Sequence, residues 1–267
     1  MKRIPTTDFR KTRTLLPDEA FALVAGERPS PTDFVTEDVW NGIMHLPDDV
    51  AITTSNHHGS QLAALYTLWG GWVEAIGDEH DELFTGMLDA ADCFQASTFD
   101  SLHGYYRSAL SNLRSAIELV AIGSLGNLLP NDKDYLRWTK QNLGSLPFAS
   151  SIRKLRGATA KPISTVILKP NGSIEALYNE LCAYTHSRPD ASDGKLWESN
   201  GPIYVTAAVN LVFELQVSTY AVCYLLVKLG RPSLVLPTAS SFLFTTPELL
   251  WRDDIVANYH TLCSVHE

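Results

Sequence analysis

One histidine and the polar residues around it are the best candidates for chemistry in this sequence. His186 follows an apolar helical pattern that stops before Pro189, and imidazole can act as a general acid or base near neutral pH. Asn179 lies seven residues earlier on the same helix face, and Arg188 adds a guanidinium just after the helix. The alternative interpretation is structural, because a histidine at this place can also bind the last carbonyl groups of its helix.

A second polar group is expected to lie inside the fold. Arg114 and Glu118 are spaced i, i+4 on a long predicted helix that also carries Arg107. Glu214 lies in the middle of a stretch too apolar to be exposed, so its carboxylate needs a cationic or hydrogen-bonding partner. We therefore expect Arg107 or Arg114 to contact Glu118 or Glu214, rather than to form only an exposed ion pair. The predicted members of this structural polar cluster are Arg107, Arg114, Glu118, Asn210 and Glu214.

The elements that must position these residues are helices. Apolar residues recur at helical spacing in several separate stretches. These stretches are Asn56–Ile76, Asp81–Ala96, Ser101–Leu129, Ser173–Thr185, Pro202–Gly230 and Pro247–Cys263. The pattern predicts an all-α, mostly antiparallel helical bundle that forms a single domain over residues 55–267. Residues 1–54 hold five prolines and predict an irregular arm, and Ile163–Leu168 predicts a short strand.

A basic segment connects two of the predicted core helices. The whole chain has a formal net charge of −9, which disfavours indiscriminate binding to nucleic acid, but residues 131–170 contain eight basic and two acidic residues. With aromatic residues nearby, such a segment could bind a phosphate backbone and stack on bases; the alternative is a solvated connector. The expected RNA-binding residues are Lys133, Arg137, Lys140, Arg153, Lys154 and Arg156.

Cysteine usage and hydropathy place the chain in the cytoplasm. The four cysteines are far apart and form no CxxC pair, which indicates a reducing compartment, and the N-terminal residues contain no continuous apolar signal segment. Ile203–Val227 is long enough to span a bilayer, but its central Glu214 favours a buried core helix. The sequence contains no nucleotide-binding, zinc-protease or nucleophile-elbow motif, so we expect no metal and no cofactor.

Two segments together resemble a known superfamily. The pairing of LSNLRSAIE on one helix with YNELCAYTHSRPD on a later one resembles the HEPN superfamily of prokaryotic helical bundles, over about residues 81–230. The resemblance implies a helical bundle and a homodimer. Many members are ribonucleases in toxin–antitoxin, anti-phage or CRISPR settings, and others are not catalytic.

The catalytic motif of that superfamily is only partly present. Active members carry an arginine, then a polar residue, then a histidine after four to six intervening positions. His186 matches the histidine, but the arginine position falls on Asn179 and the polar position on Glu180. Arg188 or Arg114 would have to replace the missing arginine in space.

Three functions follow from these observations. The first is a dimeric binding or regulatory module in defence, in which the polar cluster fixes the helix register and a stripe of small residues mediates contact. That stripe is Gly104, Ser108, Ser111 and Ser115. The second is a metal-independent endoribonuclease, in which His186 activates the 2′-hydroxyl and Arg188 or Arg114 holds the phosphate. The third is a small-molecule pocket between helices.

Overall fold

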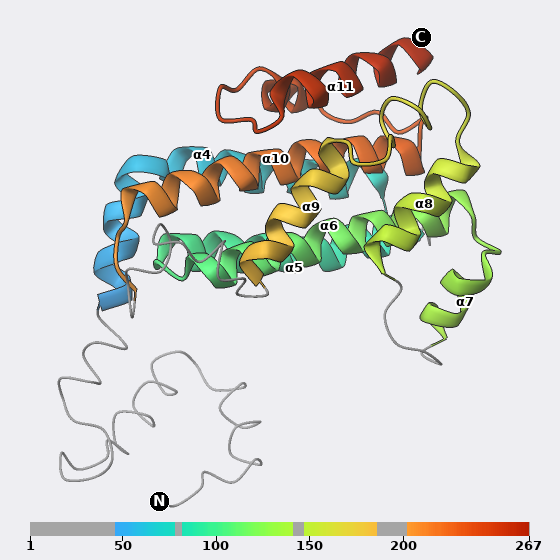
Figure 1. Ribbon diagram of the computed structural model, residues 1–267. Helices are drawn as coiled ribbons and strands as arrows, with labels where there is room; N and C mark the ends of the chain where they lie inside the picture. Colours follow the sequence, from blue (N-terminus) through green and yellow to red (C-terminus); the bar gives the residue numbers. More distant parts are fainter. Residues whose placement is uncertain (1–45, 78–81, 141–146, 186–201, 267) are drawn as a thin grey trace, which may run out of the picture. The chain divides into compact units, whose positions relative to one another are not determined.

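The structure is a computed structural model that describes residues 46–77, 82–140, 147–185 and 202–266. Every regular element within these ranges is a helix, so the predicted all-α class is confirmed (Figure 1). The residues from Pro47 onward form one unit. The elements are α4 (Leu46–Ile76), α5 (Glu82–Leu102), α6 (Tyr106–Leu128), α7 (Lys133–Thr139), α8 (Phe148–Ala158), α9 (Ser173–Thr185), α10 (Thr206–Gly230), the 3₁₀ helix η1 (Thr238–Phe244) and α11 (Arg252–His266).

Helix α4 begins earlier than the sequence pattern predicted. Pro47 occupies its first turn, where proline is tolerated, and Asp48 and Asp49 favour the positive end of the helix. The predicted arm of residues 1–54 is therefore helical from residue 46 onward; its earlier part lies outside the described residues. The Gly70–Gly71 pair does not interrupt the helix, because buried apolar side chains on both sides of the pair anchor it to the core.

Helices α5 and α6 pack against each other through glycine. A Cβ atom on Gly86 would lie 2.7 Å from the carbonyl oxygen of Leu119, and one on Gly123 would lie 3.2 Å from the Cα atom of Leu83. Real Cβ atoms do not approach backbone atoms as closely as the first of these distances. The backbones of the two helices are thus close enough at this crossing that only glycine fits at residue 86.

A turn divides the long helix that was predicted for Ser101–Leu129. Ser101 and Leu102 belong to the end of α5, and α6 starts only at Tyr106. Between them Gly104 has a φ of +81°, a left-handed conformation that glycine adopts without steric cost. A Cβ atom on Gly104 would also lie 3.1 Å from the backbone nitrogen of Ile203, so this glycine makes a close contact within the chain.

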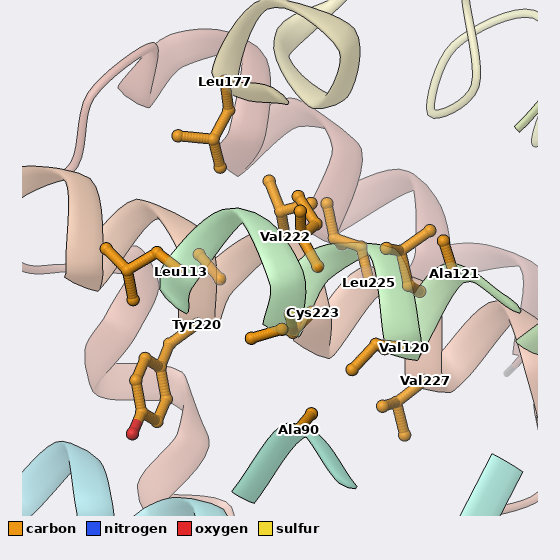
Figure 2. Packing of buried hydrophobic residues seen from close by; sticks show 14 of the residues in the cluster. Ala90, Leu113, Val120, Ala121, Leu177, Tyr220, Val222, Cys223, Leu225 and Val227 are labelled. Carbon is orange, nitrogen blue, oxygen red and sulfur yellow. The ribbon is translucent and has the colours of Figure 1, made fainter. Parts of the chain in front are cut away.

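Helix α10 is the central element of the core. Figure 2 shows its side chains, among them Tyr220 and Cys223, between Ala90 of α5 and Leu177 of α9. The Ser124 hydroxyl of α6 donates to the carbonyl oxygen of Leu226 at 2.8 Å.

The directions of the core helices follow from three contacts. Near the start of α6, Tyr106 donates to Ile203, and near its end Asn127 donates to Gly230, so α6 and α10 run in the same direction. The short turn at Gly104 makes α5 antiparallel to α6. The long connection through α7, α8 and α9 returns the chain to the end of the bundle where α6 begins (Figure 1).

Helix α10 also has the length and composition of a membrane span. Among the described residues it is the one helix that meets both conditions, with a mean hydropathy of 1.4 over its most apolar window. That window is 78% buried inside the bundle. Such burial is typical of the core helix of a helical bundle.

The connector between α6 and α9 is helical and turn-rich. Asp132 caps α7 by accepting hydrogen bonds from the backbone nitrogens of Asp134 and Tyr135. The predicted strand at Ile163–Leu168 is wrong, because these residues form successive turns. The backbone N–H groups of residues 164–168 bond to carbonyls three to five residues earlier, as in Val166 to Pro162 at 2.9 Å, and so are not available to a partner strand.

The C-terminal helix covers α10. It starts at Arg252 rather than at Pro247, which the sequence pattern had predicted. Aromatic rings join it to the rest of the unit: Tyr259 stacks on Phe244 with ring centroids 4.0 Å apart, and both rings contact Tyr224 of α10. Helix α11 therefore adds an outer layer to the core, and it also binds the start of α9, where Asn258 donates to the hydroxyl of Ser173 at 3.1 Å and Asp254 accepts from the backbone nitrogen of Ser173 at 3.0 Å.

Candidate functional site

The strongest polar constellation joins α6 to α9. Arg114 Nη2 donates to Glu118 Oε1 at 2.9 Å and to the hydroxyl oxygen of Tyr178 at 3.2 Å. The Tyr178 hydroxyl in turn donates to the same oxygen of Glu118. We call these three residues the α6–α9 triangle. Each of them contacts the other two, so the prediction that Arg114 contacts Glu118 in a partly buried cluster is confirmed.

Local helix geometry explains how the triangle is assembled. Arg114 and Glu118 are one turn apart on α6 and therefore face the same side. Tyr178 reaches them from α9, and its ring stacks on Phe148 of α8 with centroids 4.0 Å apart and an interplanar angle of 16°. The carbon Cζ of Arg114 lies 5.6 Å from the centroid of the same tyrosine ring, within the range of a cation–π interaction.

The triangle is partly screened from water. The side chains of Arg114 and Glu118 are 24% and 26% exposed, and Arg114 Nε is buried without a hydrogen-bond partner among the described residues. Burial lowers the pKa of the Arg114 guanidinium, but Tyr178 and Glu118 outweigh this effect and raise it above its ordinary value. Burial and the Glu118 carboxylate raise the pKa of the Tyr178 hydroxyl. Arginine is therefore charged and tyrosine neutral at physiological pH.

A second arginine binds the end of α9. Arg107 Nε donates to the carbonyl oxygen of Tyr184 at 3.3 Å, which places a cation at the negative end of that helix. Burial, with the nearby Glu180, raises the pKa of the Tyr184 hydroxyl to about 12. Arg107 and Arg114 therefore hold α9 at two separate points along α6.

The predicted catalytic residues are placed only in part. His186 and Arg188 lie outside the described residues. Asn179 is exposed on α9, next to Tyr178. Arg114 belongs to the triangle, where its positive charge is balanced by Glu118. Of the four predicted catalytic residues, the described part of the chain therefore contains two: Arg114, which is ion-paired, and Asn179, which is exposed to solvent.

The other two predicted members of the structural polar cluster lie elsewhere. Asn210 is at the exposed end of α10, and its Oδ1 contacts Nε2 of His58 at 3.1 Å. Glu214 lies near Glu248, and burial together with that second carboxylate raises the pKa of Glu214. The prediction that Glu214 belongs with Arg114 needs correction: in the described residues the arginine binds the carboxylate on its own helix, one turn away.

Many cations of the basic segment are paired with acids. Lys154 lies 2.6 Å from Asp132 and 2.9 Å from Asp134, so its pKa is raised by both carboxylates. Arg156 lies 2.5 Å from Glu175. Outside the predicted set, Lys169 pairs with Asp254. Within the segment these ion pairs tie α8 to the start of α7, and they tie the segment to α9 and α11 outside it.

The remaining predicted RNA-binding residues are more accessible. Arg137 is largely exposed and only 3.9 Å from Asp134, a distance at the edge of an ion pair. Lys133, Lys140 and Arg153 are exposed. The segment thus presents scattered cations to the solvent, while Lys154 and Arg156 serve the fold.

Sequence reasoning missed two features of the site. Tyr178 completes the triangle, but it falls within an apolar pattern that predicts only a helix. A second set of buried polar atoms belongs to Thr54, His58 and Gln216, which come from distant parts of the chain. The sequence signal that could have indicated this second set is Gln216, a polar residue on the buried side of an apolar helix. Among the described residues, no group of three or more histidine, cysteine or acidic side chains lies close enough to hold a metal ion.

Comparison with known proteins gives no match. No family model, no curated protein and no solved structure matches this chain.

Proposed function

We propose that this chain is a HEPN-like, dimeric helical module that binds or regulates a partner in defence and does not itself cleave RNA. One observation supports the noncatalytic part most strongly. In the α6–α9 triangle, the guanidinium of Arg114 is bound to a carboxylate and a hydroxyl of its own chain. A phosphate would have to displace Glu118 before this arginine could hold it.

The basic segment supports the same proposal. Lys154 and Arg156 have carboxylate partners within 2.6 Å, so their charges are balanced inside the unit. Counterion release from RNA depends on cations that are available to phosphates. Two of the six expected RNA-binding cations are therefore not available to phosphates, which weakens the case for the binding of an RNA strand.

The alternative proposal is metal-independent cleavage of RNA by His186. The observation in its favour is Arg107, whose guanidinium binds the carbonyl oxygen of Tyr184, two residues before that histidine in the sequence. Cleavage at a 2′-hydroxyl needs a general base and a cation that holds the phosphate. From the sequence, Arg188 or Arg114 was expected to replace the arginine that the motif lacks, and the contact with Tyr184 adds Arg107 as a third candidate.

A cleavage assay separates the two proposals. The full-length protein is incubated with mixed RNA in EDTA, beside His186→Ala and Arg107→Gln variants. We expect the wild type and both variants to leave the RNA equally intact. Cleavage by the wild type that is lost in His186→Ala would overturn the noncatalytic proposal and establish the alternative. Equal cleavage by all three proteins would indicate a contaminating nuclease and is resolved by repeating the assay with further purified protein.

The dimer is tested by light scattering coupled to size-exclusion chromatography. The proposal predicts a mass of two copies of the 29.5 kDa chain at micromolar concentration. A mass of one copy across a hundredfold range of concentration would contradict the dimeric part of the proposal and leave the noncatalytic part standing.

A further inference from the structure

A small cavity lies between α4, α5 and α10, helices that do not build the α6–α9 triangle. Its volume, counted as the space open to the centre of a water molecule, is about 10 Å³. A single buried water needs roughly this much room. Four apolar side chains of α4 and α10 form part of the wall, and the polar wall consists of Thr54, His58, Ser101 and Gln216.

Three polar atoms of this wall are buried without a partner among the described residues. They are Thr54 Oγ1, His58 Nδ1 and Gln216 Oε1. The residues Thr54 and Gln216 are both 0% exposed, so bulk water does not reach their side chains. Buried polar groups in folded proteins almost always have a hydrogen-bond partner, so three orphan atoms around one cavity indicate a bound molecule.

The neighbouring contacts determine which hydrogen-bonding role each atom has. His58 Nε2 lies 3.1 Å from Asn210 Oδ1, an acceptor, so Nε2 is the donor, and in the tautomer that carries its proton on Nε2 the other nitrogen, Nδ1, is an acceptor. The ring of Phe213 lies 5.2 Å from the His58 ring and limits its rotation. Gln216 Nε2 donates to the Thr98 hydroxyl at 3.1 Å, which leaves Oε1 as an acceptor on the cavity side.

The cavity wall therefore offers two unpaired acceptors and one unpaired hydroxyl group, because the hydroxyl of Ser101 already donates to the carbonyl oxygen of Ser97. We propose that it binds a single water molecule, which donates to His58 Nδ1 and Gln216 Oε1 and accepts from the hydroxyl of Thr54. An ammonium or alkali cation fits less well, because the wall contains no carboxylate to balance its charge. The bound water adds hydrogen bonds between α4 and α10 beside the direct contacts that His58 makes with Asn210 and Phe213.

A crystal structure at high resolution tests the site directly. We expect electron density for one water within about 2.7–3.2 Å of all three atoms. A cavity without density, or side chains turned so that the three atoms bond to each other, would overturn the proposal.

Thermal unfolding of the Thr54→Val variant tests the site in solution. The change replaces a hydroxyl by a methyl group of similar size. If the water is bound, it loses a partner, and the melting temperature should fall by about 2–4 °C, as expected for the loss of one hydrogen bond in a chain of this size. If the cavity is dry, the variant removes an unpaired hydroxyl, and the melting temperature should rise or stay the same.

Thr219→Val is the matched control. Thr219 is also a buried threonine in a helix, but its hydroxyl donates to the carbonyl oxygen of Leu215 at 2.7 Å, and it is not part of the wall of this cavity. If the water is bound, each variant loses one hydrogen bond and the two melting temperatures should fall by similar amounts. If the cavity is dry, only Thr219→Val should lower the melting temperature, and this result would overturn the proposal. A wild-type melting temperature that rises in ammonium chloride relative to sodium chloride at equal ionic strength, with no such rise in Thr54→Val, would show that a cation occupies the site instead.

Discussion

Helix α6 is held on two sides by contacts of different kinds. Against α5, the glycines Gly86 and Gly123 bring two backbones into direct contact. Against α9, long polar side chains meet in the α6–α9 triangle, and Phe148 supports its tyrosine from α8. The first contact depends on the absence of side-chain atoms, and the second depends on three functional groups in one geometry.

Because of this difference, the two contacts should tolerate different kinds of substitution. At the α5 contact there is no space for a further carbon atom, so any substitution must push the helices apart. At the α9 contact the side chains are about a quarter exposed and can rearrange, but removal of one group leaves its partners unsatisfied. Added side-chain atoms should therefore disrupt the contact with α5, and removed polar or charged groups should disrupt the contact with α9.

The largest effect is expected at the glycine contact. In Gly86→Ala, the new Cβ atom would lie 2.7 Å from the carbonyl oxygen of Leu119. We expect the free energy of unfolding to fall by about 1–3 kcal/mol, as for other overpacked cores. Denaturant unfolding of the full-length protein, followed by circular dichroism, measures this change.

Gly70→Ala is the control for the intrinsic preference of alanine. Gly70 is an exposed residue of α4, and a Cβ atom there would meet no atom within 4 Å. Alanine should raise the free energy of unfolding by about 0.5–1 kcal/mol at this position. Equal effects of the two substitutions would show that α5 and α6 are not in close contact at Gly86.

A smaller and opposite pair of effects is expected for two carboxylates. Glu118 binds Arg114 and Tyr178, whereas Glu214 lies near Glu248. Glu118→Gln should lower the free energy of unfolding by about 1–2 kcal/mol, because hydrogen bonds to a charged group become neutral ones. Glu214→Gln should raise it by less than about 1 kcal/mol, because it removes a charge repulsion near the surface.

The pH dependence of the Glu214 effect follows from the direction of its pKa shift. Burial and Glu248 raise the pKa of Glu214 in the folded protein, so the protonated form is favoured. Its contribution to stability is present below the pKa of the unfolded chain and is lost as pH rises through the folded value. The increase in the free energy of unfolding caused by Glu214→Gln should therefore appear at pH 7 and vanish at about pH 4. A gain that persists unchanged at acid pH would rule out this cause.

The sequence predicted the helices and one edge of the triangle. Apolar periodicity located most core helices, and the i, i+4 spacing of Arg114 and Glu118 predicted their ion pair, because both depend on local helix geometry. The third member, Tyr178, could not be assigned, since its partner residues are about 60 positions away. The turn at Gly104 was missed because the apolar pattern continues through it.

Pairing between residues far apart in the sequence also explains where the structure differs from the sequence-based predictions for the basic segment and for Glu214. The charge count of residues 131–170 indicated an excess of cations, but Glu175 and Asp254 bind two of them from outside the segment. Glu214 was expected to be buried and is only partly buried, and its neighbour Glu248 comes from a loop that periodicity does not place. Sequence periodicity does not determine which distant side chains meet.

A double-mutant cycle on Arg114 and Tyr178 tests whether the α6–α9 triangle acts as one unit. Arg114→Met, Tyr178→Phe and the double variant are unfolded in denaturant at pH 7 beside the wild type. We predict a favourable coupling of about 0.5–3 kcal/mol, the range for residues that share a hydrogen-bond network. Additive effects, with a coupling within about 0.3 kcal/mol of zero, would contradict the interpretation that these residues together hold α9 on α6.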